Sequence, residues 1–124
     1  MGWMGRLHTR AYRSLREQYA DLGVQPELVV AADPVQTNRD DAIDRLGYAA
    51  ATANYREVLA NPEVDVVSIC SPNFLHRELA LAAVEARKPL WLEKPMGRSV
   101  DESRAITAAV EAAGLVSCVG FNYR

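Results

Sequence analysis

Residues 64–95 read VDVVSICSPNFLHRELALAAVEARKPLWLEKP, and the order of patterns in this stretch decides the fold. Residues 64–70 form an apolar run rich in Val, as in a strand that is buried on both faces of a sheet. Residues 74–87 repeat Leu and Ala at helical spacing, and residues 90–92 return to a short apolar strand. The order strand–helix–strand predicts two parallel strands joined by a right-handed crossover. The expected apolar face of the helix consists of Leu75, Leu79, Ala82, Ala83 and Ala86.

The same alternation continues on both sides of this stretch. Apolar runs predict further strands over residues 27–33, 49–53 and 115–121. Amphipathic patterns predict helices over residues 4–22, 36–46 and 55–60, and a last helix from a Ser99 cap to Gly114. The expected apolar faces are Leu7, Ala11, Leu15 and Leu22 in the first helix, and Ile106, Ala109, Val110 and Ala113 in the last. Strands that alternate with helices indicate the α/β class with a doubly wound parallel sheet.

Composition narrows the classes of function. The chain has 124 residues, a formal net charge of −2 and 49% hydrophobic residues, which predicts one domain with a substantial core. Acidic and basic residues are mixed, and no basic stripe indicates a nucleic-acid partner. No apolar run approaches the roughly 20 residues of a membrane span, and the chain does not begin with a signal segment. Cys70 and Cys118 fit no metal pattern, and we interpret them as small hydrophobes of a reduced, cytoplasmic protein.

Polar residues follow the predicted strands where each strand ends. Asp33 ends the first strand, and Ser71-Pro72-Asn73 follows the second strong one. Glu93-Lys94-Pro95 follows residues 90–92, and Gly120-Phe121-Asn122 ends the last strand. Ligands of doubly wound sheets bind at the carboxyl ends of the strands. We therefore expect the ligand site along this edge.

The N-terminus carries part of a dinucleotide-binding pattern. Gly2-Trp3-Met4-Gly5 has the spacing of the second and third glycines of the glycine-x-glycine-x-x-glycine fingerprint, whose first glycine and strand would precede Met1. The alternative is an ordinary glycine-rich helix start. Asp33 is placed to accept hydrogen bonds from ribose hydroxyls, or else it is a turn residue before Pro34.

Taken together, these motifs resemble the N-terminal domain of the Gfo/Idh/MocA family of oxidoreductases, which includes glucose–fructose oxidoreductase and inositol 2-dehydrogenase. The matching segments are residues 2–5, 30–33, 68–73 with His76, 88–95 and 120–122. The resemblance implies a Rossmann-like sheet that lacks its first strand. It also implies that residues 1–124 are a partial dinucleotide-binding domain without the substrate domain, inactive by itself. Arg87 departs from the family at a position where glycine is frequent.

The resemblance assigns a role to each matching residue. Gly2, Trp3, Met4 and Gly5 would cradle the pyrophosphate at a helix N-terminus. Asp33 would hold the adenosine ribose, and Ser71, Pro72 and Asn73 would line the cofactor channel. His76 either supports the cofactor loop or packs against Ala83.

The remaining roles concern the nicotinamide end. Glu93 would reach the nicotinamide ribose, and Asn122 would lie near the nicotinamide. Lys94 would contact both the cofactor and the substrate hydroxyl as the catalytic residue, after a Lys94-Pro95 bond that is often cis in the family. A direct Glu93–Lys94 ion pair is disfavoured, because adjacent residues of a strand point to opposite faces.

The expected activity is an NAD(P)-dependent oxidation of a secondary alcohol on a sugar or cyclitol. NAD is expected rather than NADP, because Asp33 would repel a 2′-phosphate, although Arg39 in the next helix could reach back and weaken this preference. The resemblance further implies a homo-oligomer. Two alternatives stay open: a glycosidase of the same family that uses NAD, and a non-catalytic dinucleotide-binding protein.

Overall fold

The computed structural model describes residues 1–122, which form two compact units. The first unit comprises Met1–Val58, and the second begins at Leu59. Each unit is built on parallel strands and the helices beside them. Among the described helices, none has the length and apolar character that a membrane crossing requires.

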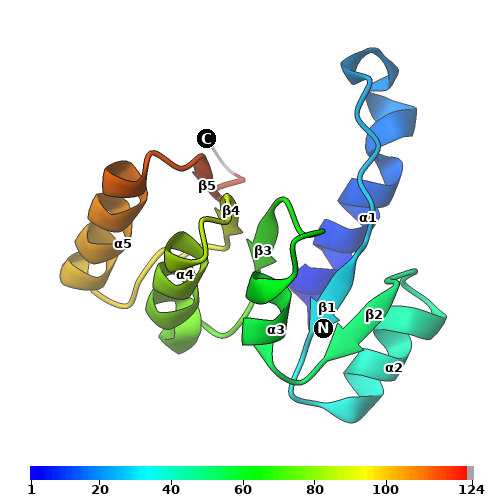
Figure 1. The fold of residues 1–124 in the computed structure, drawn as a ribbon, viewed down its shortest axis with the longest axis horizontal. Helices are drawn as coiled ribbons and strands as arrows, with labels where there is room; N and C mark the ends of the chain where they lie inside the picture. Colours follow the sequence, from blue (N-terminus) through cyan, green and yellow to red (C-terminus); the bar gives the residue numbers. More distant parts are fainter. Residues whose placement is uncertain (123–124) are drawn as a thin grey trace. The chain divides into compact units, whose positions relative to one another are not determined.

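The first unit contains a two-stranded parallel sheet (Figure 1). Its strands are β1 (Val30–Ala32) and β2 (Ala50–Thr52), paired with Val30 opposite Ala50. Helix α2 (Gln36–Asp44) connects them. The long helix α1 (Trp3–Gln18) and the 3₁₀ turn η1 (Ala20–Leu22) precede β1, and α3 (Tyr55–Ala60) follows β2 and leads into the second unit.

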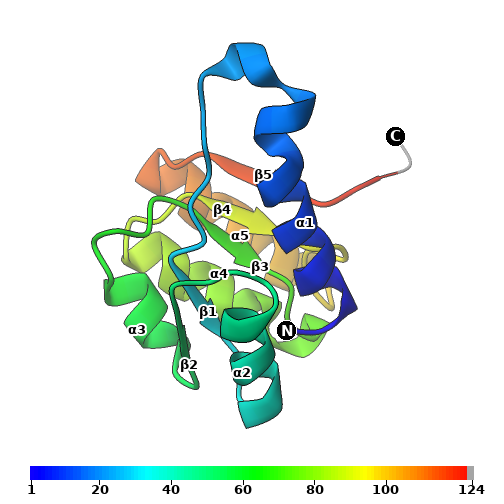
Figure 2. The ribbon, with the colours of Figure 1, turned by 90° about the vertical axis from the view of Figure 1, so that its right-hand side faces the viewer.

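The second unit contains a three-stranded parallel sheet in the order β3–β4–β5 (Figure 2). The strands are β3 (Val67–Ile69), β4 (Leu90–Leu92) and β5 (Ser117–Val119). The 3₁₀ turn η2 (Asn73–Leu75) and helix α4 (His76–Glu85) connect β3 to β4, and helix α5 (Val100–Ala113) connects β4 to β5. This is the strand–helix–strand order that residues 64–95 predict.

Alternation along the strands builds the core of the second unit. Val67, Ile69, Leu90 and Leu92 are buried, whereas Trp91 between the last two is 39% exposed. Ile106 and Val110 of α5 are also buried, as the periodicity of the sequence predicts. The predicted cap is confirmed as well, because the Ser99 side chain accepts a hydrogen bond from the Glu102 N–H.

The buried face of α4 differs from the predicted one. His76, Ala80 and Ala83 are its buried residues, whereas Leu75, Leu79, Ala82 and Ala86 are only half-buried. The prediction counted apolar residues and therefore passed over a histidine. A histidine is buried at little cost when its ring nitrogens meet hydrogen-bond partners, which is the case here.

Helix α1 also departs from its predicted face and end. Gly5 and Thr9 are its buried residues, while Ala11 is exposed. The Thr9 hydroxyl donates to the Gly5 carbonyl at 2.8 Å and meets the Tyr48 hydroxyl at 3.1 Å, which satisfies a buried polar group. The helix ends at Gln18, so Leu22 falls in η1 and is exposed.

The parallel α/β class is confirmed, and β4 has the predicted bounds, but the other strands are shorter than their apolar runs. The runs over residues 27–33, 64–70 and 115–121 each contribute only three strand residues. Strands β1 and β2 form one sheet and β3, β4 and β5 form another. The doubly wound arrangement is therefore present as two separately hydrogen-bonded sheets.

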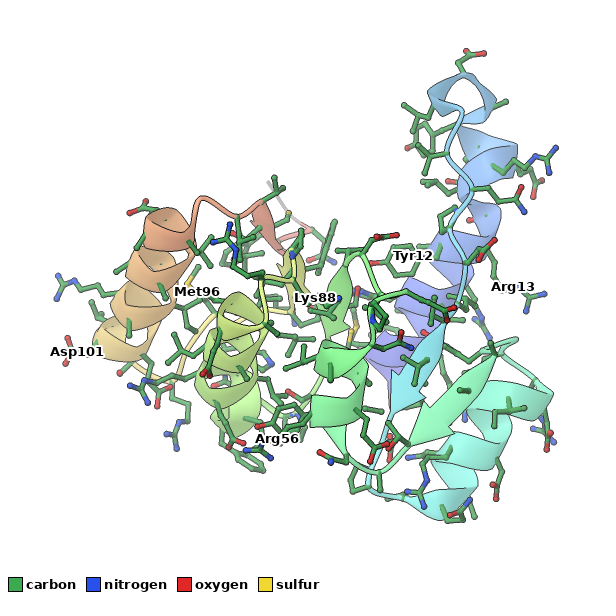
Figure 3. All side chains as sticks on the ribbon, viewed as in Figure 1. Tyr12, Arg13, Arg56, Lys88, Met96 and Asp101 are labelled. Carbon is green, nitrogen blue, oxygen red and sulfur yellow. The ribbon has the colours of Figure 1, made fainter. Side chains whose placement is uncertain are left out.

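Two basic residues fix the connection from α4 to β4. The Lys88 ammonium, labelled in Figure 3, donates to the carbonyls of Asn61 at 2.9 Å and Val64 at 2.6 Å. Such charge-assisted bonds hold the segment that enters β3. Arg87 adopts a left-handed backbone with φ of 60°, and its guanidinium donates to the Ala113 carbonyl at 2.7 Å.

The left-handed backbone at Arg87 gives a stability prediction. We expect Arg87→Gly to be more stable than Arg87→Ala by about 1 kcal/mol, because both lose the bond to Ala113 but only Ala keeps a Cβ in this conformation. Ala108→Gly, at an exposed position inside α5, is the control and should be destabilising by about 1 kcal/mol. Equilibrium urea unfolding measures all three. An Arg87→Ala protein as stable as Arg87→Gly would contradict the argument.

Candidate functional site

In the first unit, the start of α1 has the features of an anion site. Gly2 is the N-cap residue with an extended backbone, and no side chain caps the helix. The first turn contains no acidic residue. The N–H groups at a helix start carry partial positive charge and favour anions. Of the residues predicted here, Gly5 is buried, Met4 is half-buried and Trp3 is 73% exposed.

The Asp33 carboxylate is fixed beside this helix start. Its Oδ1 accepts from the Val35 N–H at 2.9 Å, and both oxygens lie 3.1 Å from the Asn38 side-chain amide. Its Oδ2 forms an ion pair with the Met1 ammonium, so the residue that precedes Gly2 lies against Asp33. The structure thus brings together the two features predicted for this unit, the glycine-containing helix start and the Asp33 carboxylate.

Arg39 reaches back to the end of β1. Its Nη1 donates to the carbonyls of Asp33 at 2.8 Å and Pro34 at 2.9 Å, and its Nη2 donates to Gln36. The guanidinium therefore binds the backbone beside Asp33 rather than the Asp33 carboxylate. The sequence indicated that Arg39 could reach back toward Asp33, but it did not indicate that backbone carbonyls would accept its hydrogen bonds.

In the second unit, β4 ends on two residues with opposite surroundings. Glu93 is 6% exposed, and its Oε2 accepts from the Lys94 N–H at 3.2 Å. The Lys94 side chain is exposed, and among residues 1–122 the structure gives its ammonium no hydrogen bond or ion pair. The Lys94-Pro95 bond is cis, as the resemblance implies. A buried carboxylate and an accessible ammonium thus follow the same strand.

The residues after β3 lie against the residues after β4. The Asn73 side-chain amide donates to the Pro95 carbonyl at 2.7 Å. The His76 ring is 1% exposed and lies between the Ser71 and Pro95 carbonyls. Ser71 is half-buried and Pro72 is exposed. Five predicted residues of this unit therefore come together: Ser71, Asn73, His76, Glu93 and Lys94.

Cys70 lies in the same neighbourhood but is not reactive. Burial, and to a lesser extent the nearby Glu93 carboxylate, raise the pKa of its thiol to about 12. The group stays protonated near neutral pH, and a protonated thiol is a poor nucleophile and metal ligand. Among residues 1–122, no cluster of three or more His, Cys, Asp and Glu side chains is arranged to hold a metal ion.

Gly120 is a residue of this cluster to which the sequence assigned no role. A Cβ on Gly120 would lie 2.6 Å from Glu93 Oε1 and 3.0 Å from Trp91 Nε1. The missing side chain therefore makes room for the Glu93 carboxylate beside the indole. The sequence signal that could have indicated this role was a glycine directly after a strand, which often marks a close approach of another group. Asn122, predicted for the nicotinamide side, is exposed at the end of the described chain.

Comparison with known proteins gives a consistent result. Residues 1–121 match the model of the family described as "Oxidoreductase family, NAD-binding Rossmann fold" (Gfo/Idh/MocA). The levoglucosan dehydrogenase of Pseudarthrobacter phenanthrenivorans is 36% identical over 123 residues, which cover 99% of this chain and 32% of that protein. The scyllo-inositol 2-dehydrogenase (NAD(+)) of Bacillus subtilis is 32% identical, covering 79% of this chain and 29% of that protein.

A solved structure extends the likeness to three dimensions. A levoglucosan dehydrogenase in complex with NADH and levoglucosan has a TM-score of 0.93 with this chain at 36% identity. The alignment covers 99% of this chain and 33% of that one. The chain spans about a third of the length of these relatives.

The room beside Gly120 gives the next prediction. We expect Gly120→Ala to destabilise the protein by about 1–3 kcal/mol, because the buried Glu93 carboxylate must leave its place. In a Glu93→Ala background the same change should cost much less, because the nearest atoms, those of the Glu93 carboxylate, are gone and only the Trp91 indole nitrogen stays within 3.0 Å. A double-mutant cycle by urea unfolding measures this coupling. Equal costs in both backgrounds would show that Glu93 is not what excludes the side chain.

Proposed function

Because this chain belongs to the Gfo/Idh/MocA family of oxidoreductases with an NAD-binding Rossmann fold, we propose that it is the cofactor-binding part of a dehydrogenase. The substrate is a secondary alcohol of a sugar or cyclitol, since relatives are named for levoglucosan and scyllo-inositol. The protein acts in the cytoplasm as a homo-oligomer. The observation that carries the proposal is the pairing of a buried Glu93 with an accessible Lys94 at the carboxyl end of β4.

The first unit has groups that fit the adenosine end of NAD. The uncapped start of α1 offers backbone N–H groups from Gly2 to Gly5 to a pyrophosphate. The Asp33 carboxylate, held by Val35 and Asn38, is an acceptor for ribose hydroxyls. A carboxylate that is already oriented loses little freedom when it binds.

The second unit has groups that fit the reacting end. When bound, NAD accepts a hydride from the alcohol carbon. The Lys94 ammonium would hydrogen-bond the alcohol oxygen and stabilise the negative charge that develops there as the hydroxyl proton passes to a base or to water. Glu93 would hold the nicotinamide ribose, Ser71, Pro72 and Asn73 would line the cofactor channel, and Asn122 would lie on the nicotinamide side. Cys70 takes no part, because its thiol stays protonated.

The test uses the protein that carries this chain together with the further two thirds that its relatives have. We expect absorbance of NADH to appear with NAD and a cyclic polyol such as levoglucosan or scyllo-inositol. Release of sugar from a glycoside without net NADH would favour the glycosidase. NAD binding with neither reaction would favour a non-catalytic role.

The role of Lys94 is tested by its removal. Lys94→Ala should lower kcat about 10²–10³-fold while the Kd for NAD changes little, because the ammonium acts on charge that develops in the transition state. Arg104→Ala removes an exposed cation of α5 and serves as the matched control with unchanged kcat. Stopped-flow absorbance and calorimetry measure the two quantities. Near-normal turnover in Lys94→Ala would rule out this role.

The choice of cofactor is tested at Asp33. We expect the protein to bind NAD at least about tenfold more tightly than NADP, because the carboxylate repels a 2′-phosphate and Arg39 is held by backbone carbonyls. Asp33→Asn should narrow this ratio, whereas Asp44→Asn, which removes an exposed charge of α2, should leave it unchanged. Calorimetric titration with both cofactors decides. Tighter binding of NADP by the unaltered protein would contradict the prediction.

A further inference from the structure

His76 occupies a position that packing alone does not explain. It is the first residue of α4, and its ring is almost completely buried. Its Nδ1 lies 2.9 Å from the Pro95 carbonyl oxygen, and its Nε2 lies 3.0 Å from the Ser71 carbonyl oxygen. A ring that only filled space against Ala83 would not need both nitrogens aimed at carbonyls. One side chain thus links the segment after β3 to the segment after β4.

The protonation state of the ring determines how many of these two carbonyls accept a hydrogen bond from it. A neutral imidazole has one N–H and donates to one of the two carbonyls, and a doubly protonated ring donates to both. The Asn73 amide lies 3.4 Å from His76 Nδ1 and also donates to the Pro95 carbonyl. In each protonation state the Pro95 carbonyl keeps a donor. An apolar side chain of similar volume would leave one of these part-buried carbonyl contacts without the ring N–H.

The linked carbonyl lies next to Lys94. On the other side of Lys94, the Glu93 N–H donates to the Ile69 carbonyl at 3.0 Å and the Lys94 N–H donates to the Glu93 carboxylate. The backbone around Lys94 is therefore held from both directions, while its side chain extends into solvent. Removing His76 takes away one of the two side chains that lie against the Pro95 carbonyl and leaves the Asn73 amide as its donor.

We propose that His76 is a positioning residue for Lys94: its ring lies between the Pro95 and Ser71 carbonyls and, together with the Asn73 amide, fixes the direction from which the Lys94 ammonium meets the substrate oxygen. This rests on the proposed function, because it assumes that Lys94 acts on the alcohol. Catalytic groups lose rate steeply when they are displaced, and about 1 Å of misplacement can cost on the order of 10²-fold. The His76 ring is 1% exposed, so in this role it makes no direct contact with substrate or cofactor.

The experiment measures kcat and the Kd for NAD in the protein that carries this chain and the remainder found in its relatives. His76→Leu should lower kcat about 10²-fold, with a much smaller change in the Kd for NAD. His76→Asn places an amide near the Nδ1 position and should retain more of kcat than His76→Gln, whose amide lies near the Nε2 position and Ser71. Val110→Ala, a buried change in α5, controls for lost stability and should leave kcat unchanged.

A double mutant separates positioning from a general loss of structure. If His76 acts through Lys94, His76→Leu should lower kcat no further in a Lys94→Ala background. A full additional loss in that background would overturn the inference, and so would normal kcat in His76→Leu beside an impaired Lys94→Ala. Should His76→Leu fail to fold, the order of kcat in the Asn and Gln variants decides in the same way. Near-normal turnover in Lys94→Ala would instead contradict the proposed function.

Discussion

The parallel register of β3, β4 and β5 is the constraint on which the candidate site of the second unit depends. Ile69, Leu92 and Val119 lie opposite one another, so the residues that follow them leave the sheet at one edge. Two backbone bonds extend this alignment beyond the strands, from the Glu93 N–H to Ile69 and from the Gly120 N–H to Leu92. Because parallel strands point the same way, the polar residues that follow them lie at the same edge of the sheet, without any direct attraction between these residues.

This alignment also places a buried carboxylate, Glu93, directly before an exposed ammonium, Lys94, at the end of β4. Glu93 follows the buried Leu92 and is itself buried, which breaks the alternation of β4, and its carboxylate lies in the space that Gly120 leaves open. Lys94 comes next and extends into solvent. A carboxylate beside a charged ammonium in water would be a weak surface pair. Here the Glu93 carboxylate is buried and accepts from the Lys94 N–H, whereas the Lys94 ammonium is exposed and stays available.

The sequence predicted those parts of the structure that rest on local patterns. Apolar runs located every strand, and Ser99 with Gly114 correctly marked the last helix. The motifs after β3 and β4 pointed to Asn73 and Lys94, which come together as the parallel order requires. The strands were predicted too long except over residues 90–92, because the apolar runs continue past the paired residues into exposed ones such as Val66, Val116 and Phe121.

What the sequence could not predict depends on contacts between distant residues. The buried side of α4 includes His76 because two carbonyls from other segments meet its ring. The role of Gly120 depends on where the Glu93 side chain turns, and that of Thr9 on a bond to Tyr48. Each is a polar or small residue whose partner lies far away in the chain, and periodicity carries no signal for such pairs.

The most direct test of the account is to map the NAD site by hydrogen–deuterium exchange. The experiment compares the protein that carries this chain, and the remainder found in its relatives, with and without NADH. The account predicts slower exchange in peptides covering residues 2–6, 33–35, 71–76 and 93–96, and unchanged exchange over the exposed face of α5. Protection confined to other segments, with residues 71–76 and 93–96 unaffected at saturating NADH, would contradict the assignment of the strand ends as the cofactor site.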